Sequence, residues 1–385
     1  MAHRSIRLTL NVTAFILLIT AGSRLYPQSA NPSTAEKTYP RSAITAIIAN
    51  DRKIVTPNGV EKLVSIQIGG STQWLSIRGK DKRNPVLLFL HGGPGLTFMP
   101  SDWTIQGPWE DYFTVVQWDQ RGAGKTFSSN DPKVIEPTMT IEQMTNDASE
   151  VVTYLRKTFG KQKIFVVGHS WGTILGVAVA QKHPDWLYAY VGVGQYVNAM
   201  RNEQDGYQFA LSQAKEHKNT EALKELEGIA PYPGDLDRLS FEKIGTERKW
   251  TGFYGGLAYG RTDLDFDNDL ATLSPDYTLQ DIDNIGAGAG YSVSHLFAPL
   301  FRINIEAVTT FRCPVFLFEG RHDYATSHAL AEEWFERIKA PSKKLIWFDN
   351  SAHMVMEEEP GKFFLHLVTD VRPLAARVGD TAPKN

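Results

Sequence analysis

The chain has 385 residues, of which 42% are hydrophobic and 22% are charged, and its formal net charge is −3. These values are ordinary for a globular enzyme and leave room for one large domain with an insertion, or for two domains. The small net charge and the lack of a Lys/Arg-rich run exclude nucleic acid as an expected partner. The single cysteine, Cys313, excludes an intramolecular disulfide and is expected to be a small core residue.

The first residues have the character of a targeting segment. Arg4 and Arg7 precede a mostly apolar stretch, residues 8–21, and small and polar residues follow it. This order is typical of a secretory signal peptide, and the apolar run is short for a bilayer span. We therefore expect residues 1–30 to be a signal peptide for export to the periplasm or the medium. The alternative is an uncleaved membrane anchor, and only in that case is a membrane an expected partner.

Beyond the N-terminus, the hydrophobic pattern predicts a mostly parallel sheet. An alternating pair of segments, residues 64–68 and 74–77, predicts a hairpin at a sheet edge. Apolar runs separated by helical stretches follow, which is the pattern of parallel strands with crossover helices. The runs expected to form these strands are residues 86–90, 113–118, 164–167, 187–193, 315–318 and 345–348. One crossover helix is predicted over residues 140–159, with Thr140 as its cap and Gln143 completing a capping box.

The strand pattern is interrupted between residues 196 and 308, where helical pieces alternate with Gly- and Pro-rich breaks. We interpret this segment as an inserted helical cap, in which the Gly/Ala run 286–290 is a flexible segment. The cap contains 18 Asp/Glu and 10 Lys/Arg and therefore carries a charge of −8. The predicted division of the chain is a linker over residues 31–50, the first part of an α/β core over 51–195, the cap over 196–308, the second part of the core over 309–376, and a flexible tail over 377–385.

The most informative motif is Gly-His-Ser-Trp-Gly at residues 168–172, directly after the apolar run 164–167. A serine in Gly-x-Ser-x-Gly sits on a sharp strand-to-helix turn that projects its hydroxyl above the sheet, and the turn is too tight for side chains at the glycines. Ser170 is therefore the candidate nucleophile. A serine hydroxyl is weakly nucleophilic, so it needs a base and a third group that orients the base.

In such a sheet the partners of the serine follow in the order acid and then histidine, each after a late strand. Asp323 follows the run 315–318 and is predicted to be the orienting acid, while His353 follows the run 345–348 and is predicted to be the base. Glu319 and Asp349 are the competing acids. Glu319 is expected at the end of a strand, and Asp349 is too near His353 in sequence for the usual loop geometry.

An oxyanion hole is predicted from the glycine-rich segment that follows another strand, residues 91–95. Consecutive glycines allow backbone N–H groups to point into the site and stabilise a tetrahedral intermediate. Pro94 has no N–H, so the expected donors are the N–H groups of Gly93 and Trp171. This chemistry requires no cofactor, and no metal is expected because the histidines do not pair at metal-ligand spacing.

Two other motifs are expected to be structural. Residues 119–126 contain Gly-Lys-Thr, but the glycine that a phosphate loop needs five positions earlier is replaced by Asp119. Asp119 and Arg121 are instead expected to pair and to brace a loop beside the site. Residues 263–267 resemble the start of a calcium loop, but Asn268 stands where that loop needs glycine, so a solvated acidic loop is expected.

The segments 91–95, 119–124 and 168–172, in this order, make the chain resemble the proline iminopeptidase branch of the α/β-hydrolase superfamily over roughly residues 50–375. The resemblance implies the α/β-hydrolase fold with a helical cap, and an aminopeptidase that releases N-terminal proline or another small residue from short peptides. It also implies that acidic side chains of the cap hold the free α-amine of the substrate. Glu203 is a candidate for this role, and a solvated helix position is the alternative.

The sequence thus predicts an exported serine hydrolase that acts through an acyl-enzyme, without a cofactor, on a short peptide or another small molecule. A carboxylesterase or amidase for small esters or amides is the alternative function. A non-catalytic binding protein on the same scaffold is the remote alternative, since such proteins typically lose a triad member. The sequence is silent on the oligomeric state.

Overall fold

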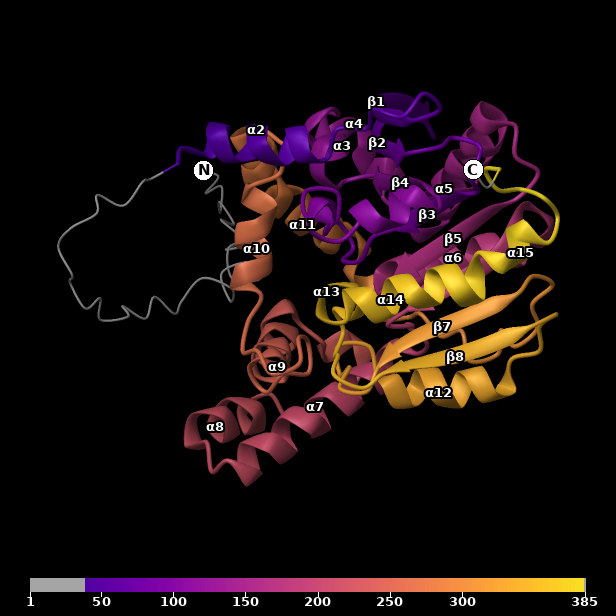
Figure 1. Cartoon of the computed structure of the whole chain (residues 1–385). Coiled ribbons are helices and arrows are strands. Elements are labelled where there is room, and N and C mark those ends of the chain that lie inside the picture. Colours follow the sequence, from indigo (N-terminus) through magenta and orange to yellow (C-terminus); the bar gives the residue numbers. More distant parts are fainter. Residues whose placement is uncertain (1–38, 384–385) are drawn as a thin grey trace, which may run out of the picture.

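A central sheet of eight strands organises the molecule in our computed structural model, which describes residues 39–383 apart from the side chain of Arg238 (Figure 1). The strand order is β1-β2-β4-β3-β5-β6-β7-β8. The strands are β1 (Val60–Ile68), β2 (Ser71–Gly79), β3 (Val86–Leu90), β4 (Thr114–Asp119), β5 (Ile164–His169), β6 (Leu187–Val193), β7 (Val315–Gly320) and β8 (Lys343–Phe348). β1 and β2 pair antiparallel, β2 pairs antiparallel with β4, and all remaining pairs are parallel. The predicted hairpin and parallel strands are confirmed.

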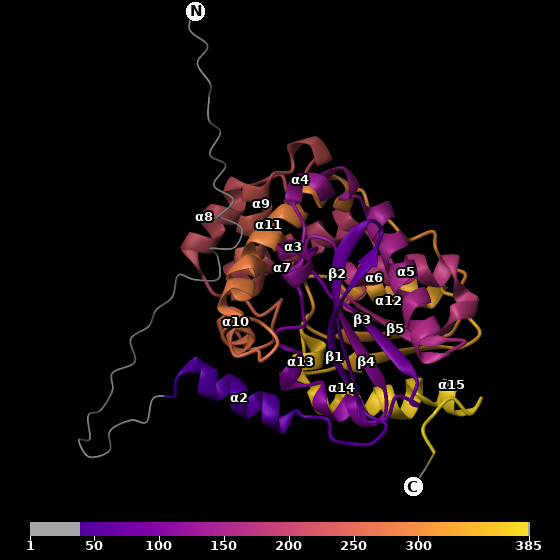
Figure 2. The same cartoon turned by 90° about the horizontal axis from the view of Figure 1, so that it is seen from above.

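Helices cover both faces of this sheet (Figure 2). One face carries α5 (Ile141–Phe159), α6 (Trp171–Lys182) and α12 (His328–Arg337), and the other carries α14 (Pro360–His366) and α15 (Pro373–Ala376). The side chains of β3 alternate between the two cores: Leu88 and Leu90 pack with the first group of helices, whereas Leu87 and Phe89 pack with the second. All five residues of β3 are fully buried, as a strand covered on both faces requires.

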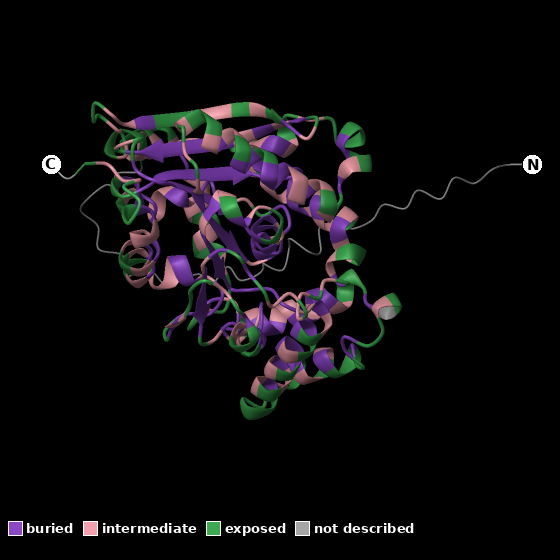
Figure 3. Cartoon of the chain, turned by 90° about the vertical axis from the view of Figure 1, so that its right-hand side faces the viewer, coloured by how far each residue is buried: buried purple, intermediate pink, exposed green. Residues whose placement is uncertain are grey.

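Five helices lie between β6 and β7 and form the cap (Figures 1 and 3). They are α7 (Ala199–Glu216), α8 (Thr220–Gly228), α9 (Phe241–Phe253), α10 (Asp265–Thr272) and α11 (Leu279–Leu300). Three further short α-helices are α3 (Gly124–Ser128), α4 (Pro132–Ile135) and α13 (Val355–Glu358). Figure 3 shows the inner strands buried between the helices, with exposed residues on the edge strand β1 and on the outer turns of the cap.

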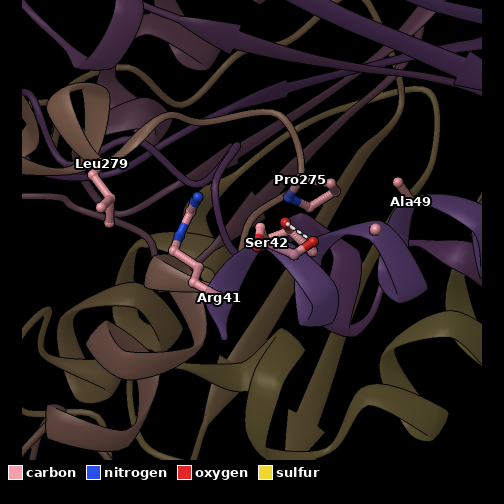
Figure 4. Close-up of a pocket in the computed structure, with 7 residues that line it drawn as sticks. Arg41, Ser42, Ala49, Pro275 and Leu279 are labelled. Atoms are coloured by element: carbon pink, nitrogen blue, oxygen red, sulfur yellow. Dashed lines mark hydrogen bonds between the residues drawn. The ribbon is translucent and has the colours of Figure 1, made fainter. Parts of the chain in front are cut away.

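The segment predicted as a linker contains a helix, α2 (Arg41–Asp51), which lies beside the cap (Figure 1). The Arg41 side chain donates hydrogen bonds to the carbonyl oxygens of Thr272 at 2.6 Å and Tyr277 at 2.7 Å. An open cavity of about 410 Å³ separates part of α2 from the cap residues Pro275 and Leu279 (Figure 4). None of the predicted site residues lines this cavity.

The predicted flexible tail is also attached to the body. The Asp380 carboxylate accepts hydrogen bonds from the Tyr188 hydroxyl at 3.0 Å and from the Lys161 ammonium group. The predicted signal peptide lies outside the residues that the structure describes. Within residues 39–383, no helix combines the length and the apolar character needed to cross a membrane.

Two details of the helices differ from the prediction. Thr140 caps α5 by accepting the Gln143 N–H at 3.1 Å, but the Gln143 side chain binds Asp147 at 2.7 Å, so the capping box is only half formed. The glycine-rich run expected to be flexible lies inside α11. A side chain at Gly288 would come within 2.8 Å of the Gly122 carbonyl oxygen. The run is therefore a small-residue face that allows α11 to pack closely on α3.

Candidate active site

Ser170 lies between the end of β5 and the start of α6. Its φ is +54° and its ψ is −121°, a conformation that residues with a side chain rarely adopt. The backbone holds it there, since the Ser170 N–H donates to the Val193 carbonyl oxygen at 2.9 Å. A side chain at Gly168 would lie 2.5 Å from the Gly172 carbonyl oxygen, and one at Gly172 would collide with the Leu90 carbonyl oxygen. The turn is therefore as tight as the Gly-x-Ser-x-Gly motif predicts.

Asp323 and His353 lie together, on the loops that follow β7 and β8. The His353 Nδ1 atom lies 2.8 Å from Asp323 Oδ2, and both residues are buried. Asp323 Oδ1 accepts the N–H groups of Ala325 at 2.9 Å and Thr326 at 2.8 Å, and the Thr326 hydroxyl donates to Oδ2 at 2.9 Å. Four donors thus surround the carboxylate, which fixes its orientation towards the imidazole.

The backbone of β6 connects Ser170 to this pair. Val193, which accepts the Ser170 N–H, directly precedes Gly194. A side chain at Gly194 would come within 2.9 Å of His353 Nδ1 and 3.0 Å of Asp323 Oδ2, so the end of β6 passes directly beneath the Asp–His pair. His353 Nε2 makes no hydrogen bond to any residue between 39 and 383. That nitrogen is the one a general base would use.

His169, immediately before the serine, also contacts the predicted base. Its Nε2–H donates to the His353 carbonyl oxygen at 3.0 Å, and the two ring centres are 4.6 Å apart. Burial holds the pKa of His169 well below its usual range, and the nearby His353 adds to this effect. His169 is therefore neutral and supports the loop that carries His353.

The predicted oxyanion donors lie on either side of Ser170. Trp171 is the first residue of α6, and Gly93 follows Gly92, where a side chain would lie 3.2 Å from Ser170 Cβ. In the described part of the chain, neither the Gly93 N–H nor the Trp171 N–H donates a hydrogen bond. Both groups are therefore available for a ligand.

The two competing acids have other partners. Glu319 is buried at the end of β7 and accepts the Gln195 N–H at 3.1 Å; burial raises its pKa well above the usual range, and the neighbouring Asp323 adds to this. Asp349 is 66% exposed and pairs with Lys362 at 3.4 Å. Neither carboxylate contacts His353, so the geometry favours Asp323 as the orienting acid.

Glu203, the predicted amine-binding candidate, lies in the first turns of α7 and is fully buried rather than solvated. Its carboxylate accepts hydrogen bonds from the Arg248 guanidinium and the Tyr232 hydroxyl. Arg248 also binds Glu247, whose pKa is raised to about 7 chiefly by burial. We call these three charged residues of α7 and α9 the cap cluster. A side chain at Gly206 would touch both Glu247 and the Tyr324 carbonyl oxygen, so the cluster lies against the loop that carries Asp323.

The structure corrects the predicted pairing of Asp119 with Arg121. Arg121 binds Asp147 at 2.8 Å rather than Asp119, so the expected pair between Asp119 and Arg121 is wrong. Asp119 instead accepts hydrogen bonds from Tyr277 of the cap and from Thr97. Within residues 39–383, no group of three or more His, Cys, Asp or Glu side chains could hold a metal ion.

Comparison with known proteins gives the family. The model of the alpha/beta hydrolase fold family matches residues 85–360. The probable aminopeptidase YbaC of Bacillus subtilis (strain 168) is 32% identical over 306 residues, which are 77% of this chain and 92% of that protein. The proline iminopeptidase of Saccharolobus solfataricus is 27% identical over 302 residues, covering 73% of this chain and 82% of that protein.

A solved structure shares the fold. The proline iminopeptidase-related protein from Thermus thermophilus aligns with a TM-score of 0.56 at 19% identity, covering 82% of this chain and 98% of that one. The chain therefore belongs to the α/β-hydrolase family and is a hydrolase. Within the family it is similar to proteins named as an aminopeptidase and as proline iminopeptidases.

Sequence reasoning missed several residues that shape this site. Thr326 binds both Asp323 and His353 Nδ1, and Asn202 of the cap binds the Ala325 carbonyl oxygen at 2.9 Å. These contacts join segments that are far apart in the chain, and no local sequence motif predicts them. Gln120 lies in a motif that the sequence analysis singled out, but its contacts also depend on the tertiary structure.

Proposed function

We propose that the protein is a serine aminopeptidase that releases N-terminal proline, or another small residue, from short peptides. The observation that carries the serine mechanism is the buried Asp323–His353 pair at 2.8 Å, beside a serine held at positive φ on a strand-to-helix turn. Similarity over 77% of the chain to a protein named as a probable aminopeptidase supports the substrate class.

The proposed reaction proceeds in two steps. His353 Nε2 takes the Ser170 hydroxyl proton as the serine oxygen attacks the substrate carbonyl carbon, and the N–H groups of Gly93 and Trp171 stabilise the oxyanion. Asp323 keeps a proton on His353 Nδ1 and stabilises the imidazolium. The imidazolium then gives its proton to the leaving amine, which leaves an acyl-enzyme. A water molecule, activated by His353, attacks the acyl carbon and releases the product.

The cap cluster is the proposed binding site for the substrate's amine. Glu203, Glu247 and Arg248 together carry a net negative charge when both acids are ionised, which favours a cation. Glu203 is bound to Arg248 in this structure, so an incoming ammonium group would compete with the guanidinium for that carboxylate. We therefore expect amine binding to depend on the charge of Glu203.

A second candidate function is an esterase or amidase without amine preference. The ion pairs of Arg248 favour this second function, because its guanidinium already occupies a carboxylate oxygen of both Glu203 and Glu247. Activities on proline p-nitroanilide, on its N-acetylated analogue and on p-nitrophenyl acetate would separate the two. A strong preference for the free amine supports the aminopeptidase; equal turnover of the blocked substrate, with ester cleavage, would replace it with the esterase.

Replacing Glu203 with Gln tests the amine site directly. We expect KM for proline p-nitroanilide to rise by at least about tenfold, because a charge-assisted hydrogen bond is worth about 1.5–3 kcal/mol. KM for an N-blocked substrate should not change. Glu225→Gln is the matched control, since this cap acid binds Lys249 at 2.8 Å and is partly exposed. Equal effects of E203Q on both substrates would remove Glu203 from the proposal.

Export is a separate proposal that rests on residues 1–30 alone. The mass of the protein recovered from fractionated cells tests it. Loss of roughly the first 30 residues together with an extracytoplasmic location is the expected result. Full-length protein in the membrane fraction would favour the anchor.

A further inference from the structure

Gln120, directly after β4, connects the two backbone segments that carry the proposed oxyanion donors. It is fully buried. Its side-chain amide donates to the His91 carbonyl oxygen at 3.0 Å, and its side-chain oxygen accepts the Trp171 indole N–H at 2.9 Å. Its backbone N–H donates to His91 Nε2 at 3.2 Å. Gln120 thus makes three hydrogen bonds to His91 and Trp171, and its carbonyl oxygen accepts a fourth from the Ala123 N–H at 2.9 Å.

The bond to His91 fixes the direction of the Gly93 N–H. Because His91 Nε2 accepts from Gln120, the ring proton is on Nδ1, which donates to the Gly92 carbonyl oxygen at 2.8 Å. The Gly92 carbonyl and the Gly93 N–H belong to one planar trans peptide and point in opposite directions. Holding the carbonyl against His91 therefore turns the N–H away from His91. Burial lowers the pKa of His91 to about 4, so the ring stays neutral and keeps this arrangement.

The bond to Trp171 fixes the second donor. Trp171 is 1% exposed, and its N–H belongs to the peptide that follows Ser170, at the first position of α6. Anchoring the indole to Gln120 restricts rotation of that residue relative to the segment 91–93. The backbone N–H of Gln120 thus orients the His91 ring, while its side-chain amide ties the His91 carbonyl oxygen to the Trp171 indole and so sets the spacing of the two donor segments.

The cap holds this segment in place. Asp119, one residue before Gln120, accepts hydrogen bonds from the cap residue Tyr277, from Thr97, and from the Lys125 N–H at 2.7 Å. Arg41 of α2 binds the Tyr277 carbonyl oxygen at 2.7 Å. Asp119 is therefore held by hydrogen bonds from both the core and the cap, and Gln120 follows it directly in the chain.

We propose that Gln120 is the positioning residue of the oxyanion hole, acting through His91 on the Gly93 N–H and through the indole of Trp171 on the Trp171 N–H. This inference rests on the proposed serine mechanism. Gln120 does not touch the reacting atoms. Its loss should leave the substrate-binding surface and the Asp–His pair in place, while the two donors lose their fixed spacing.

The test compares Gln120→Met with Gln120→Glu and Trp171→Phe. Methionine at position 120 keeps the volume and the backbone N–H that orients His91, but it removes both side-chain hydrogen bonds that set the spacing. Glutamate keeps an acceptor for the indole. Phenylalanine at position 171 keeps the backbone N–H but removes the indole donor. We expect Gln120→Met to lower kcat about 10- to 100-fold with KM within about twofold, since misplacement by about 1 Å costs on that order. Gln120→Glu and Trp171→Phe should each lose less than Gln120→Met.

Gln73→Met is the matched control. Gln73 is equally buried, accepts the Trp118 indole N–H at 2.8 Å and donates to Asp147 at 2.8 Å, away from Ser170. It should lower the melting temperature as Gln120→Met does, with kcat unchanged. A boronic acid analogue of proline, which forms a tetrahedral adduct on serine, provides a second measurement. Its inhibition constant would not change if Gln120 had only a structural role. Its inhibition constant should rise in Gln120→Met in proportion to the loss of kcat/KM.

The outcomes separate this inference from the proposed function. If Ser170→Ala keeps wild-type activity, the serine mechanism itself fails. If Ser170→Ala is inactive but folded Gln120→Met keeps kcat and the inhibition constant within about threefold of wild type, only the role of Gln120 is overturned. Should Gln120→Met not fold, Gln120→Glu and Trp171→Phe decide: wild-type kcat in both would refute the proposal.

Discussion

Replacing Asp323 with Asn should inactivate the enzyme by moving the ring proton of His353 from Nδ1 to Nε2. Asp323 Oδ1 accepts two backbone N–H groups, from Ala325 at 2.9 Å and Thr326 at 2.8 Å. The amide oxygen of the introduced asparagine must take that position, because the opposite orientation would leave two buried N–H donors facing an NH₂ group, at a cost of about 1–3 kcal/mol for each unpaired donor. The amide nitrogen then replaces Oδ2, which lies 2.8 Å from His353 Nδ1.

An amide nitrogen at this position donates a hydrogen bond, so His353 Nδ1 must accept it and the ring proton moves to Nε2. In that tautomer the imidazole cannot take the proton of the serine. The expected loss in kcat is about 10³- to 10⁴-fold, equivalent to about 4–5.5 kcal/mol in the activation free energy. The fold should be kept, because the side-chain volume and the bonds from the Ala325 and Thr326 N–H groups are unchanged, and the Thr326 hydroxyl can rotate to accept from the new NH₂ group.

The assay is kcat at 25 °C on whichever substrate the wild type turns over, together with a thermal melt that verifies folding. Asp349→Asn is the control, since Asp349 is exposed and pairs with Lys362 rather than with His353; it should keep full activity. An Asp323→Asn variant within tenfold of wild type, with Asp349→Asn impaired, would refute the assignment of the acid.

Three further predictions concern the serine turn and the oxyanion loop. Ser170→Ala should lower kcat by about 10⁶-fold, to the residual rate that the oxyanion hole and substrate binding support, while the melting temperature stays close to wild type; a loss of less than about 10³-fold would argue against the nucleophile. Gly172→Ala places a methyl group against the Leu90 carbonyl oxygen and should cost about 3 kcal/mol in the free energy of unfolding, measured by urea denaturation. Gly361→Ala, where the methyl group meets no atom, should not destabilise; similar losses in both would contradict the packing argument. The pKa of His91 is lowered by burial to about 4, so its contribution to stability is complete above its unfolded pKa of about 6.5 and is lost as the pH falls towards 4. Between pH 7 and pH 5 the wild type should lose about 2 kcal/mol that His91→Gln does not lose, and equal pH dependence in both proteins would refute this.

The inner strands could be predicted from the sequence because each is a continuous apolar run that is covered on both faces. The run 86–90 coincides with β3, and the run 187–193 with β6. The turn at Ser170 was equally predictable, since the lack of space at Gly168 and Gly172 is a local property of the motif. Such features depend on residues that are close together in the chain.

The remaining contacts depend on which segments meet in three dimensions. Arg121 pairs with Asp147 because α5 packs beside the loop after β4, and a nearer acid in sequence, Asp119, is turned towards the cap. In the sequence, the glycines of α11 are typical of a flexible linker. In the structure they lie in a helix, where their small size allows α11 to pack against α3. The alternative that the sequence left open for Glu203, a solvated helix position, is likewise not found, because Glu203 is buried and paired with Arg248.

The measurement that tests the central claim most directly is labelling with a fluorophosphonate, followed by peptide mass spectrometry of wild type, Ser170→Ala and Asp323→Asn. A fluorophosphonate reacts with a serine that a neighbouring base activates. We predict one stoichiometric adduct on Ser170 in the wild type, none in Ser170→Ala, and greatly slowed labelling in Asp323→Asn. No adduct on the active wild type, or an adduct on another residue that persists in Ser170→Ala, would contradict the proposed serine mechanism.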